Sequence, residues 1–230
     1  GDNAMLDAMT AGLKKYRPEL KITLMANNKK VCRSRFGVHC VSRNNFMGVL
    51  FTLRRSSFFI LGGGTLLQNA TSPRSLSYYL FVSRIASAVG CRLIIYGSGL
   101  GPLYGRRARR RVAVLLAHAD LIGLREPSAF DMLRSLKVPL RRACVYADPA
   151  LLTQPALDTR VNFLMSENVG KGREVTDGRY IAVSLREVIS RKCKLSDDSA
   201  FIPRLAASLD GICSLLSAEP LFFNFSSDDA

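Results

Sequence analysis

The stretch Ser57-Phe58-Phe59-Ile60-Leu61-Gly62-Gly63-Gly64-Thr65 decides the fold class of this 230-residue chain. A short continuous apolar run that stops at a cluster of glycines is typical of a buried β-strand followed by a tight turn. The same pattern recurs at Arg92–Tyr96, which runs into Gly97-Ser98-Gly99. Strands that are apolar on both faces belong to parallel sheets that helices cover on both sides. The two stretches therefore predict a parallel sheet.

Helical patterns alternate with these strands along the chain. We expect helices after Asp2, around 46–53, and at 74–89, 106–118 and 127–136, and further strands at 20–25, 121–124 and 143–146. This alternation indicates an α/β domain built on a doubly wound parallel sheet. In such a sheet, ligands bind at the carboxyl ends of the strands. Both glycine loops are expected at that edge.

A second, smaller unit is predicted after the first. The periodicity fails over 151–178, where prolines and glycines indicate a linker, and residues 1–150 form the N-terminal domain. Residues 179–230 then begin another α/β unit, with strands expected at 180–185 and 221–225 around a helix at 199–216. Two strands are too few to bury a sheet of their own. We therefore expect a truncated second domain, and a first strand missing before Gly1.

The charge balance points to anionic partners. The chain has 33 Lys and Arg against 18 Asp and Glu, a formal net charge of +15. The densest run is Arg106–Arg111, which fits either a solvated helix start or attraction to an anionic membrane surface. It lacks the interleaved aromatic residues typical of nucleic-acid binding, so we expect no nucleic-acid partner. No apolar run approaches the roughly 18 residues of a membrane span. A cytoplasmic location is expected, with the membrane periphery as an open alternative.

Four features at the strand ends are candidate parts of a ligand site. The Gly62-Gly63-Gly64 turn exposes backbone amides and Thr65 adds a hydroxyl, although a plain tight turn explains the same residues. Arg125 and Arg186 each follow a predicted strand, where a guanidinium could bind phosphate or form a surface salt bridge. Asp148 also follows a strand, as a turn former or a site carboxylate. His39, expected before a loop, and His118, expected within a helix, have no partners at metal-ligand spacing, so no metal site is predicted.

A series of motifs spans nearly the whole chain. The most specific is Gly62-Gly63-Gly64-Thr65-Leu66-Leu67-Gln68-Asn69 followed by Thr71-Ser72. The others are Gly1-Asp2-Asn3-Ala4-Met5-Leu6, Ser75-Leu76 with Tyr78-Tyr79-Leu80, Gly99-Leu100-Gly101-Pro102, Arg125-Glu126-Pro127-Ser128, Ala147-Asp148-Pro149-Ala150 and Val183-Ser184-Leu185-Arg186. In content and order, this series resembles the polysaccharide pyruvyl transferase family.

The resemblance implies a fold and a reaction. The fold would be two Rossmann-like domains in a glycosyltransferase-B-like arrangement with the active site between them. The reaction would transfer a pyruvyl group from phosphoenolpyruvate, with no further cofactor, to a sugar of a lipid-linked or polymeric cell-wall glycan or exopolysaccharide. It leaves a ketal and releases phosphate. The substrate-binding residues would be Arg186, then Arg125 and Gly62–Thr65, with Gln68, Ser98, Gly99 and Asp148 beside them.

The sequence also departs from the family pattern. Family members carry an Arg-Leu-His motif in the C-terminal domain as the proton donor, and this triplet is absent here, so we expect it beyond Ala230 and expect the 230-residue chain to be inactive. Asn69, Asp2-Asn3 and Ser98 stand where the family commonly has Asp, Asp-Glu and Gln. Two alternatives stay open: a nucleotide-sugar-dependent glycosyltransferase of the same architecture, and a non-catalytic homologue that binds anionic surfaces.

Overall fold

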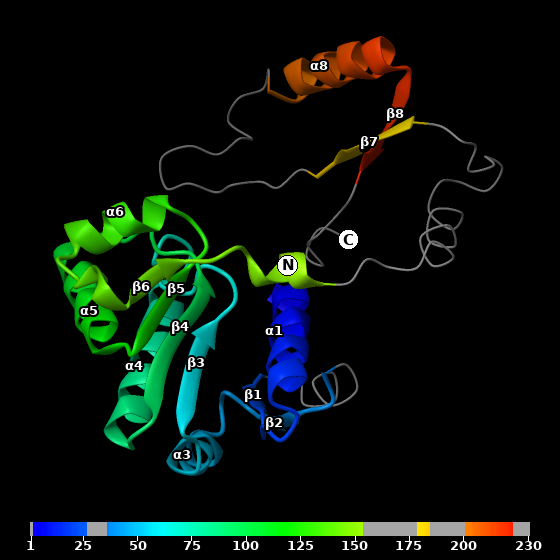
Figure 1. Cartoon of the computed structure of the whole chain (residues 1–230). Helices are drawn as coiled ribbons and strands as arrows, with labels where there is room; N and C mark the ends of the chain where they lie inside the picture. Colours follow the sequence, from blue (N-terminus) through cyan, green and yellow to red (C-terminus); the bar gives the residue numbers. More distant parts are fainter. Residues whose placement is uncertain (1, 27–35, 154–178, 185–200, 223–230) are drawn as a thin grey trace. The chain divides into compact units, whose positions relative to one another are not determined.

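The computed structural model describes residues 2–26, 36–153, 179–184 and 201–222. The chain divides into two compact units, residues 1–153 and 154–230, which are considered separately. All strand pairs among the described residues are parallel, and helices connect the strands of the four-stranded sheet (Figure 1). The predicted α/β class with a parallel sheet is therefore confirmed.

The central sheet of the first unit has four strands in sequence order. They are β3 (Phe58–Gly62), β4 (Arg92–Ser98), β5 (Leu121–Leu124) and β6 (Ala143–Val145). The register places Gly62 beside Tyr96 and Tyr96 beside Gly123. The order does not reverse among these described strands. Because parallel crossovers are right-handed, the helices that connect them lie on one face of the sheet.

Three helices cover that face: α4 (Pro73–Ala88), α5 (Arg106–His118) and α6 (Ser128–Ser135). Ser72 caps α4 by accepting a hydrogen bond from the Ser75 N–H, and Pro73 occupies the first turn, where its missing N–H costs nothing. Between helices and sheet lies the main apolar core, which includes Leu61, Leu93, Ile95, Ile122 and Leu124 from the strands and Leu80, Leu116 and Leu133 from the helices.

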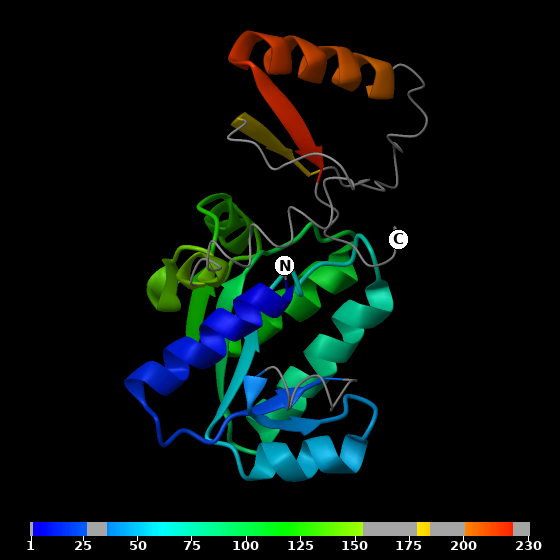
Figure 2. The same cartoon turned by 90° about the vertical axis from the view of Figure 1, so that its right-hand side faces the viewer.

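The opposite face is covered by α1 (Asp2–Tyr16), and the short helix η2 (Pro149–Leu152) packs against α1 (Figures 1 and 2). A Cβ on Gly62 would lie 2.5 Å from Met9 Cε, so glycine at this position permits the close approach of α1. A Cβ on Gly123 would lie 2.8 Å from the Tyr146 ring. On this face Ile94 and Tyr96 are only half-buried, whereas Ile95 on the other face is fully buried. The two faces are covered unequally.

A separate two-stranded sheet pairs β1 (Thr23–Met25) with β2 (His39–Val41). We predicted β1 as the longer segment 20–25 and did not predict β2, whose three residues are too few to show a period. His39, expected before a loop, begins this strand, and the loop 42–45 follows it. The next helix, α3 (Phe46–Arg54), is capped by the Asn45 side chain, which accepts a hydrogen bond from the Gly48 N–H.

The described part of the second unit is one β-α-β element. It consists of β7 (Arg179–Val183), α8 (Phe201–Leu216) and β8 (Ala218–Phe222), with β7 and β8 parallel. The predicted order of elements is confirmed here, but β8 begins three residues before the expected 221. No helix within the described ranges has both the length and the apolar character to cross a membrane.

Candidate functional site

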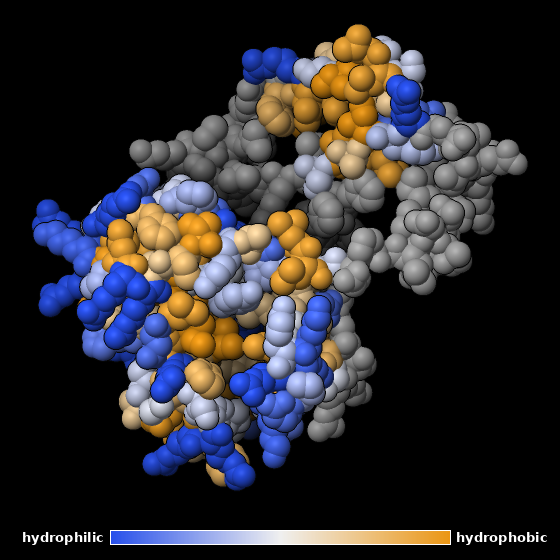
Figure 3. Space-filling model, viewed as in Figure 1, coloured by the Kyte–Doolittle hydropathy of each residue, from blue (hydrophilic) through white to orange (hydrophobic). Residues whose placement is uncertain are grey.

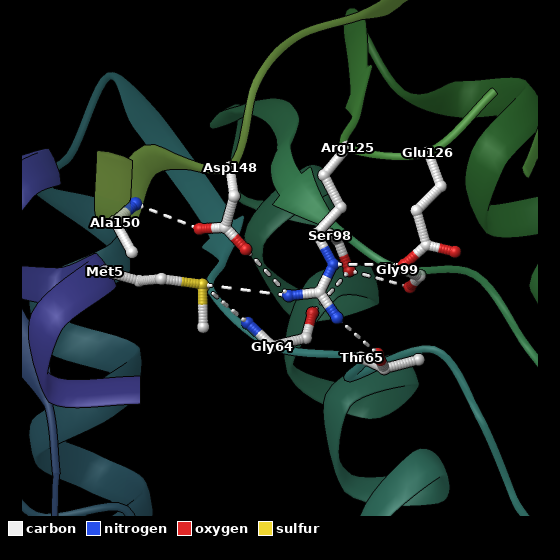
Figure 4. A network of polar contacts seen from close by, with 9 residues as sticks. All are labelled: Met5, Gly64, Thr65, Ser98, Gly99, Arg125, Glu126, Asp148 and Ala150. Atoms are coloured by element: carbon white, nitrogen blue, oxygen red, sulfur yellow. Dashed lines mark hydrogen bonds and ion pairs between the residues drawn. The ribbon is translucent and has the colours of Figure 1, made fainter. Parts of the chain in front are cut away.

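Arg125 is the centre of a polar network at the carboxyl edge of the central sheet (Figure 4). Its Nη1 donates to Asp148 Oδ2 at 3.1 Å, and its Nη2 donates to Thr65 Oγ1 at 3.1 Å. Its Nε donates to Glu126 Oε1 at 3.3 Å. The three partners come from three different strand-end segments. One guanidinium therefore joins the ends of β3, β5 and β6.

Local sequence places each partner. Strand β5 ends at Leu124, so Arg125 is the first residue beyond it, and Asp148 lies three residues beyond the end of β6. The other carboxylate oxygen of Asp148 accepts a hydrogen bond of 2.9 Å from the Ala150 N–H and caps η2. Asp148 therefore forms a turn, as its sequence context suggested, and its second carboxylate oxygen contacts Arg125.

The triple-glycine turn follows β3 and needs glycine for its backbone. Gly63 and Gly64 have φ angles of 78° and 60°, in the left-handed region that side chains disfavour. The Gly64 N–H points to Met5 Sδ at 3.5 Å, and a thioether is a weak acceptor. The Met5 Sδ also lies 4.0 Å from Arg125 Nη1. The turn therefore presents an amide with a weak partner next to the guanidinium.

The Gly97-Ser98-Gly99 segment supports this turn from behind. Gly97 and Ser98 belong to β4, where the register with β5 is irregular, and not to a loop. Ser98 is fully buried, and its Oγ donates to the carbonyls of Gly64 and Gly99. A Cβ on Gly99 would lie 2.6 Å from Thr65 Oγ1. In this structure, the segment positions Gly64 and Thr65 for the network.

Asn69 joins the segment that follows β3 to the segment that follows β4. Its Nδ2 donates to the Tyr104 carbonyl at 2.9 Å, and its Oδ1 accepts from the Tyr104 N–H at 2.7 Å. Beside this pair, Leu67 and Leu100 form an isolated parallel bridge, so the loops extend the β3–β4 pairing beyond the strands. The Gln68 side chain closes its own turn by accepting from the Ala70 and Thr71 N–H groups and donating to Thr71 Oγ1.

The network contains more carboxylates than guanidinium groups. Arg125 supplies one positive charge against two negative charges on Glu126 and Asp148, and the Arg125 side chain is 22% exposed. The Glu126 and Asp148 side chains are more exposed, at 54% and 34%. An incoming phosphate or carboxylate could therefore exchange with one of these carboxylates on the guanidinium, whose fork geometry suits bidentate binding.

A tyrosine pair adjoins the network. Tyr146, two residues before Asp148, has its ring centroid 6.2 Å from that of Tyr96, and its N–H donates to the Leu124 carbonyl. A side-chain hydrogen bond with Cys144 raises the pKa of Tyr146, and burial and the Tyr96 hydroxyl add to this shift. No three His, Cys, Asp or Glu side chains gather as a metal site within the part of the chain that the structure describes.

The structure brings most of the predicted site residues together. Gly64, Thr65, Ser98, Gly99, Arg125 and Asp148 lie in or directly behind the network (Figure 4). Gly62 instead packs against α1, and Arg186 lies outside the described residues. Sequence reasoning did not assign roles to Met5 or Glu126. Met5 resembled an ordinary core residue of α1, and only the fold places its sulfur beside Gly64.

A sequence profile described as polysaccharide pyruvyl transferase matches residues 1–214. The chain belongs to this family. Within the polysaccharide pyruvyl transferase family, this member is matched across the whole first unit and into α8 of the second. No curated protein and no solved structure matches the chain. The family resemblance predicted from the sequence motifs is confirmed. Membership of this family identifies the chain as a transferase at the family level.

Three of the family-like motifs meet at one place in this pyruvyl transferase family member. The triple-glycine segment, the Arg-Glu-Pro-Ser segment and the Ala-Asp-Pro-Ala segment supply Thr65, Arg125 and Asp148, respectively. Thr65 and Arg125 are 60 residues apart in the sequence, and Arg125 and Asp148 are 23 residues apart. A parallel sheet explains this convergence, because the carboxyl ends of its strands share one edge.

Proposed function

We propose that this chain transfers a pyruvyl group from phosphoenolpyruvate to a sugar of a cell-wall or exopolysaccharide precursor. Two hydroxyls of the sugar become the two ketal oxygens, and phosphate is released. Membership of the polysaccharide pyruvyl transferase family supports the reaction class. The single structural observation that carries the proposal is the contact of Arg125 with Thr65 and Asp148 at the carboxyl edge of the sheet.

The donor has the chemistry that this network can accept. Phosphoenolpyruvate carries a phosphate and a carboxylate, and both suit the Arg125 fork. When the donor binds, one of its oxygens replaces the Asp148 or Glu126 carboxylate on Arg125. The Gly64 N–H, whose present partner is a thioether, gains a stronger acceptor, and the Thr65 hydroxyl donates its proton to the same anion. Arg186 remains predicted as a further donor contact.

The reaction needs a proton donor. The Arg125 network contains no histidine that could serve as this donor. A proton must reach the methylene carbon of the enol, so that one sugar hydroxyl adds to the adjacent carbon. The second hydroxyl then closes the ring as the carbon–oxygen bond to phosphate breaks, and phosphate leaves with that electron pair. The two hydroxyls release two protons in total: one is taken up by the leaving phosphate and the other replaces the proton that the methylene carbon received. His118 ends α5 and His39 begins β2, and neither contacts Arg125. We therefore assign donor binding, and not proton donation, to the described residues.

Calorimetric titration of the 230-residue chain tests the donor. We expect saturable binding of phosphoenolpyruvate that Arg125→Lys weakens at least tenfold, while Arg134→Lys leaves it unchanged. Arg134 is a matched control because it pairs with Asp131 on the exposed surface of α6. A nucleotide-sugar that binds tightly when phosphoenolpyruvate does not would instead support a glycosyltransferase of the same architecture.

A non-catalytic homologue is the second candidate, and a specific observation favours it. Arg125 is paired with two carboxylates, which compete with an anionic donor for the same guanidinium. Phosphate release from phosphoenolpyruvate in the presence of a sugar acceptor separates the candidates. Binding of phosphoenolpyruvate together with phosphate release supports the transferase. Binding with no release from a chain that contains the Arg-Leu-His motif supports the non-catalytic homologue.

A further inference from the structure

The start of helix α5 carries five arginines with two different roles. Arg109 Nη2 donates to Ser135 Oγ at 3.0 Å, and Arg111 Nη1 donates to Ser77 Oγ at 3.2 Å. These two half-buried arginines attach α5 to α6 and α4. The other three, Arg106, Arg107 and Arg110, are exposed. They are named the α5 arginine patch here.

The α5 arginine patch has no carboxylate partner among the described residues. Among the described residues Arg17 pairs with Glu19 and Arg134 with Asp131. Exposed arginines elsewhere in the described ranges, such as Arg54 and Arg84, also lack a carboxylate partner, so the clustering of three such arginines is what distinguishes the patch. Hydrophilic side chains project over α5 at the left edge of the space-filling view (Figure 3). Three uncompensated positive charges in two helical turns repel each other, so an anionic surface would stabilise them.

Helix stability does not account for this patch. The first turn of α5 contains no acidic residue, and its N-cap is Gly105, which has no side chain to cap the helix. Positive charges at a helix N-terminus oppose the helix dipole, so Arg106 and Arg107 destabilise the helix that carries them. Glutamine or serine at these positions would serve the fold better. Stabilisation of α5 therefore does not account for these arginines.

The patch lies at the same edge of the sheet as the Arg125 network. Helix α5 begins after β4 ends, at the edge where β5 leads into Arg125. The patch starts two residues after Tyr104, whose backbone is clamped by Asn69 of the triple-glycine loop. The Tyr104 side chain is itself 49% exposed. An amphipathic aromatic residue beside arginines is typical of surfaces that sit at a membrane–water interface.

We propose that the α5 arginine patch, with Tyr104 beside it, docks this protein on the surface of an anionic lipid bilayer. Guanidinium groups bind lipid phosphates, and a planar array of headgroups can engage three neighbouring arginines at once. A bilayer fits better than a nucleic acid, because Tyr104 is the one aromatic residue close to the patch in sequence and provides no stacking series. The docking stands apart from pyruvyl transfer and does not depend on it.

Vesicle co-sedimentation of the full chain tests the proposal. The probes are vesicles of phosphatidylcholine alone and of phosphatidylcholine with phosphatidylglycerol. The patch variant is Arg106→Gln/Arg107→Gln/Arg110→Gln. Its charge-matched control is Arg54→Gln/Arg84→Gln/Arg92→Gln, which changes three exposed arginines away from the patch. Thermal melting of all proteins confirms folding, since every substituted side chain is exposed.

We expect wild type to bind only the anionic vesicles and to be released by salt, because the attraction is screened over roughly 10 Å at 0.1 M salt. The patch variant should lose about a hundredfold in partition, and the control much less, since each basic residue near the surface contributes separately. The proposal is overturned if control and patch variants lose binding equally. It is also overturned if the patch variant keeps vesicle binding but loses binding to a single-stranded oligonucleotide.

Discussion

Arg125 and Asp148 lie 23 residues apart in the sequence and form an ion pair of 3.1 Å where β5 and β6 end. The same guanidinium reaches Thr65, which follows the triple-glycine turn after β3. A single side chain thus holds three segments in a fixed geometry. The geometry of these segments depends on Arg125 and on the nearby residues Gly99 and Asn69.

Arg125→Lys should weaken the site and destabilise the fold. A lysine ammonium is a compact charge that cannot contact Thr65, Glu126 and Asp148 together. We expect a loss of about 1–2 kcal/mol in the free energy of unfolding, measured by urea denaturation. Arg134→Lys, at an exposed pair, should change it by less than about 0.5 kcal/mol. Equal losses of unfolding free energy for the two substitutions would show that the Arg125 network stabilises the fold no more than an exposed ion pair does.

Asn69→Asp should open the clamp between the two glycine loops. An ionised carboxylate can accept from the Tyr104 N–H but cannot donate to the Tyr104 carbonyl, and it places two acceptors against each other. Because Asn69 is only 9% exposed, the expected loss is about 1–3 kcal/mol in unfolding free energy. The control is Asn44→Asp, at an exposed position, which thermal melting should barely detect. An unchanged melting temperature for Asn69→Asp would contradict the clamp.

Gly99→Ala should displace Thr65 from Arg125. The added Cβ would lie 2.6 Å from Thr65 Oγ1 and 3.3 Å from its Cβ, so the threonine must move. Overpacking of this kind costs about 1–3 kcal/mol, and we also expect weaker binding of phosphoenolpyruvate. Gly12→Ala is the matched control, since nothing lies within 4 Å of its added Cβ and alanine favours the α1 helix. Retained donor binding in Gly99→Ala would argue against a role for Thr65.

Cys91 should resist thiol reagents in the native protein. Burial raises its pKa, and its Sγ–H donates to the Leu53 and Ser56 carbonyls, so the reactive thiolate is scarce. Mass spectrometry after brief alkylation should find Cys144 and Cys213, which are partly exposed, modified before Cys91. Comparable rates at all three would show that Cys91 is reachable by local opening.

The same shift has a consequence for stability at high pH. Because the folded state raises the pKa of Cys91, it binds the proton more tightly than the unfolded state does. The stabilisation is complete below the unfolded thiol value of about 8.5 and is lost as the pH rises through the higher folded value. Other groups titrate here too, so the measurement is the difference between wild type and Cys91→Ala in urea midpoint from pH 7 to 10. A difference that does not vary with pH would contradict the shift.

The order of elements and the edge that carries the site could be predicted from the sequence. Apolar runs such as Phe58–Leu61 that end in glycine are local signals, and parallel connections bring strand ends to one edge without further information. The motif series also identified the family correctly. The sequence alone therefore identifies Arg125, Asp148 and Thr65 as candidate site residues.

Only the tertiary structure decided what these residues contact. Three contacts join segments far apart in the chain: Asp148 with Arg125, the Met5 sulfur with the Gly64 N–H, and Asn69 with the Tyr104 backbone. The short strand β2 also depends on a partner, because three residues gain stability from pairing with β1 and not from their own pattern. Local periodicity reports which face of an element is apolar. Which side chains meet is set by long-range packing, which a single sequence does not display.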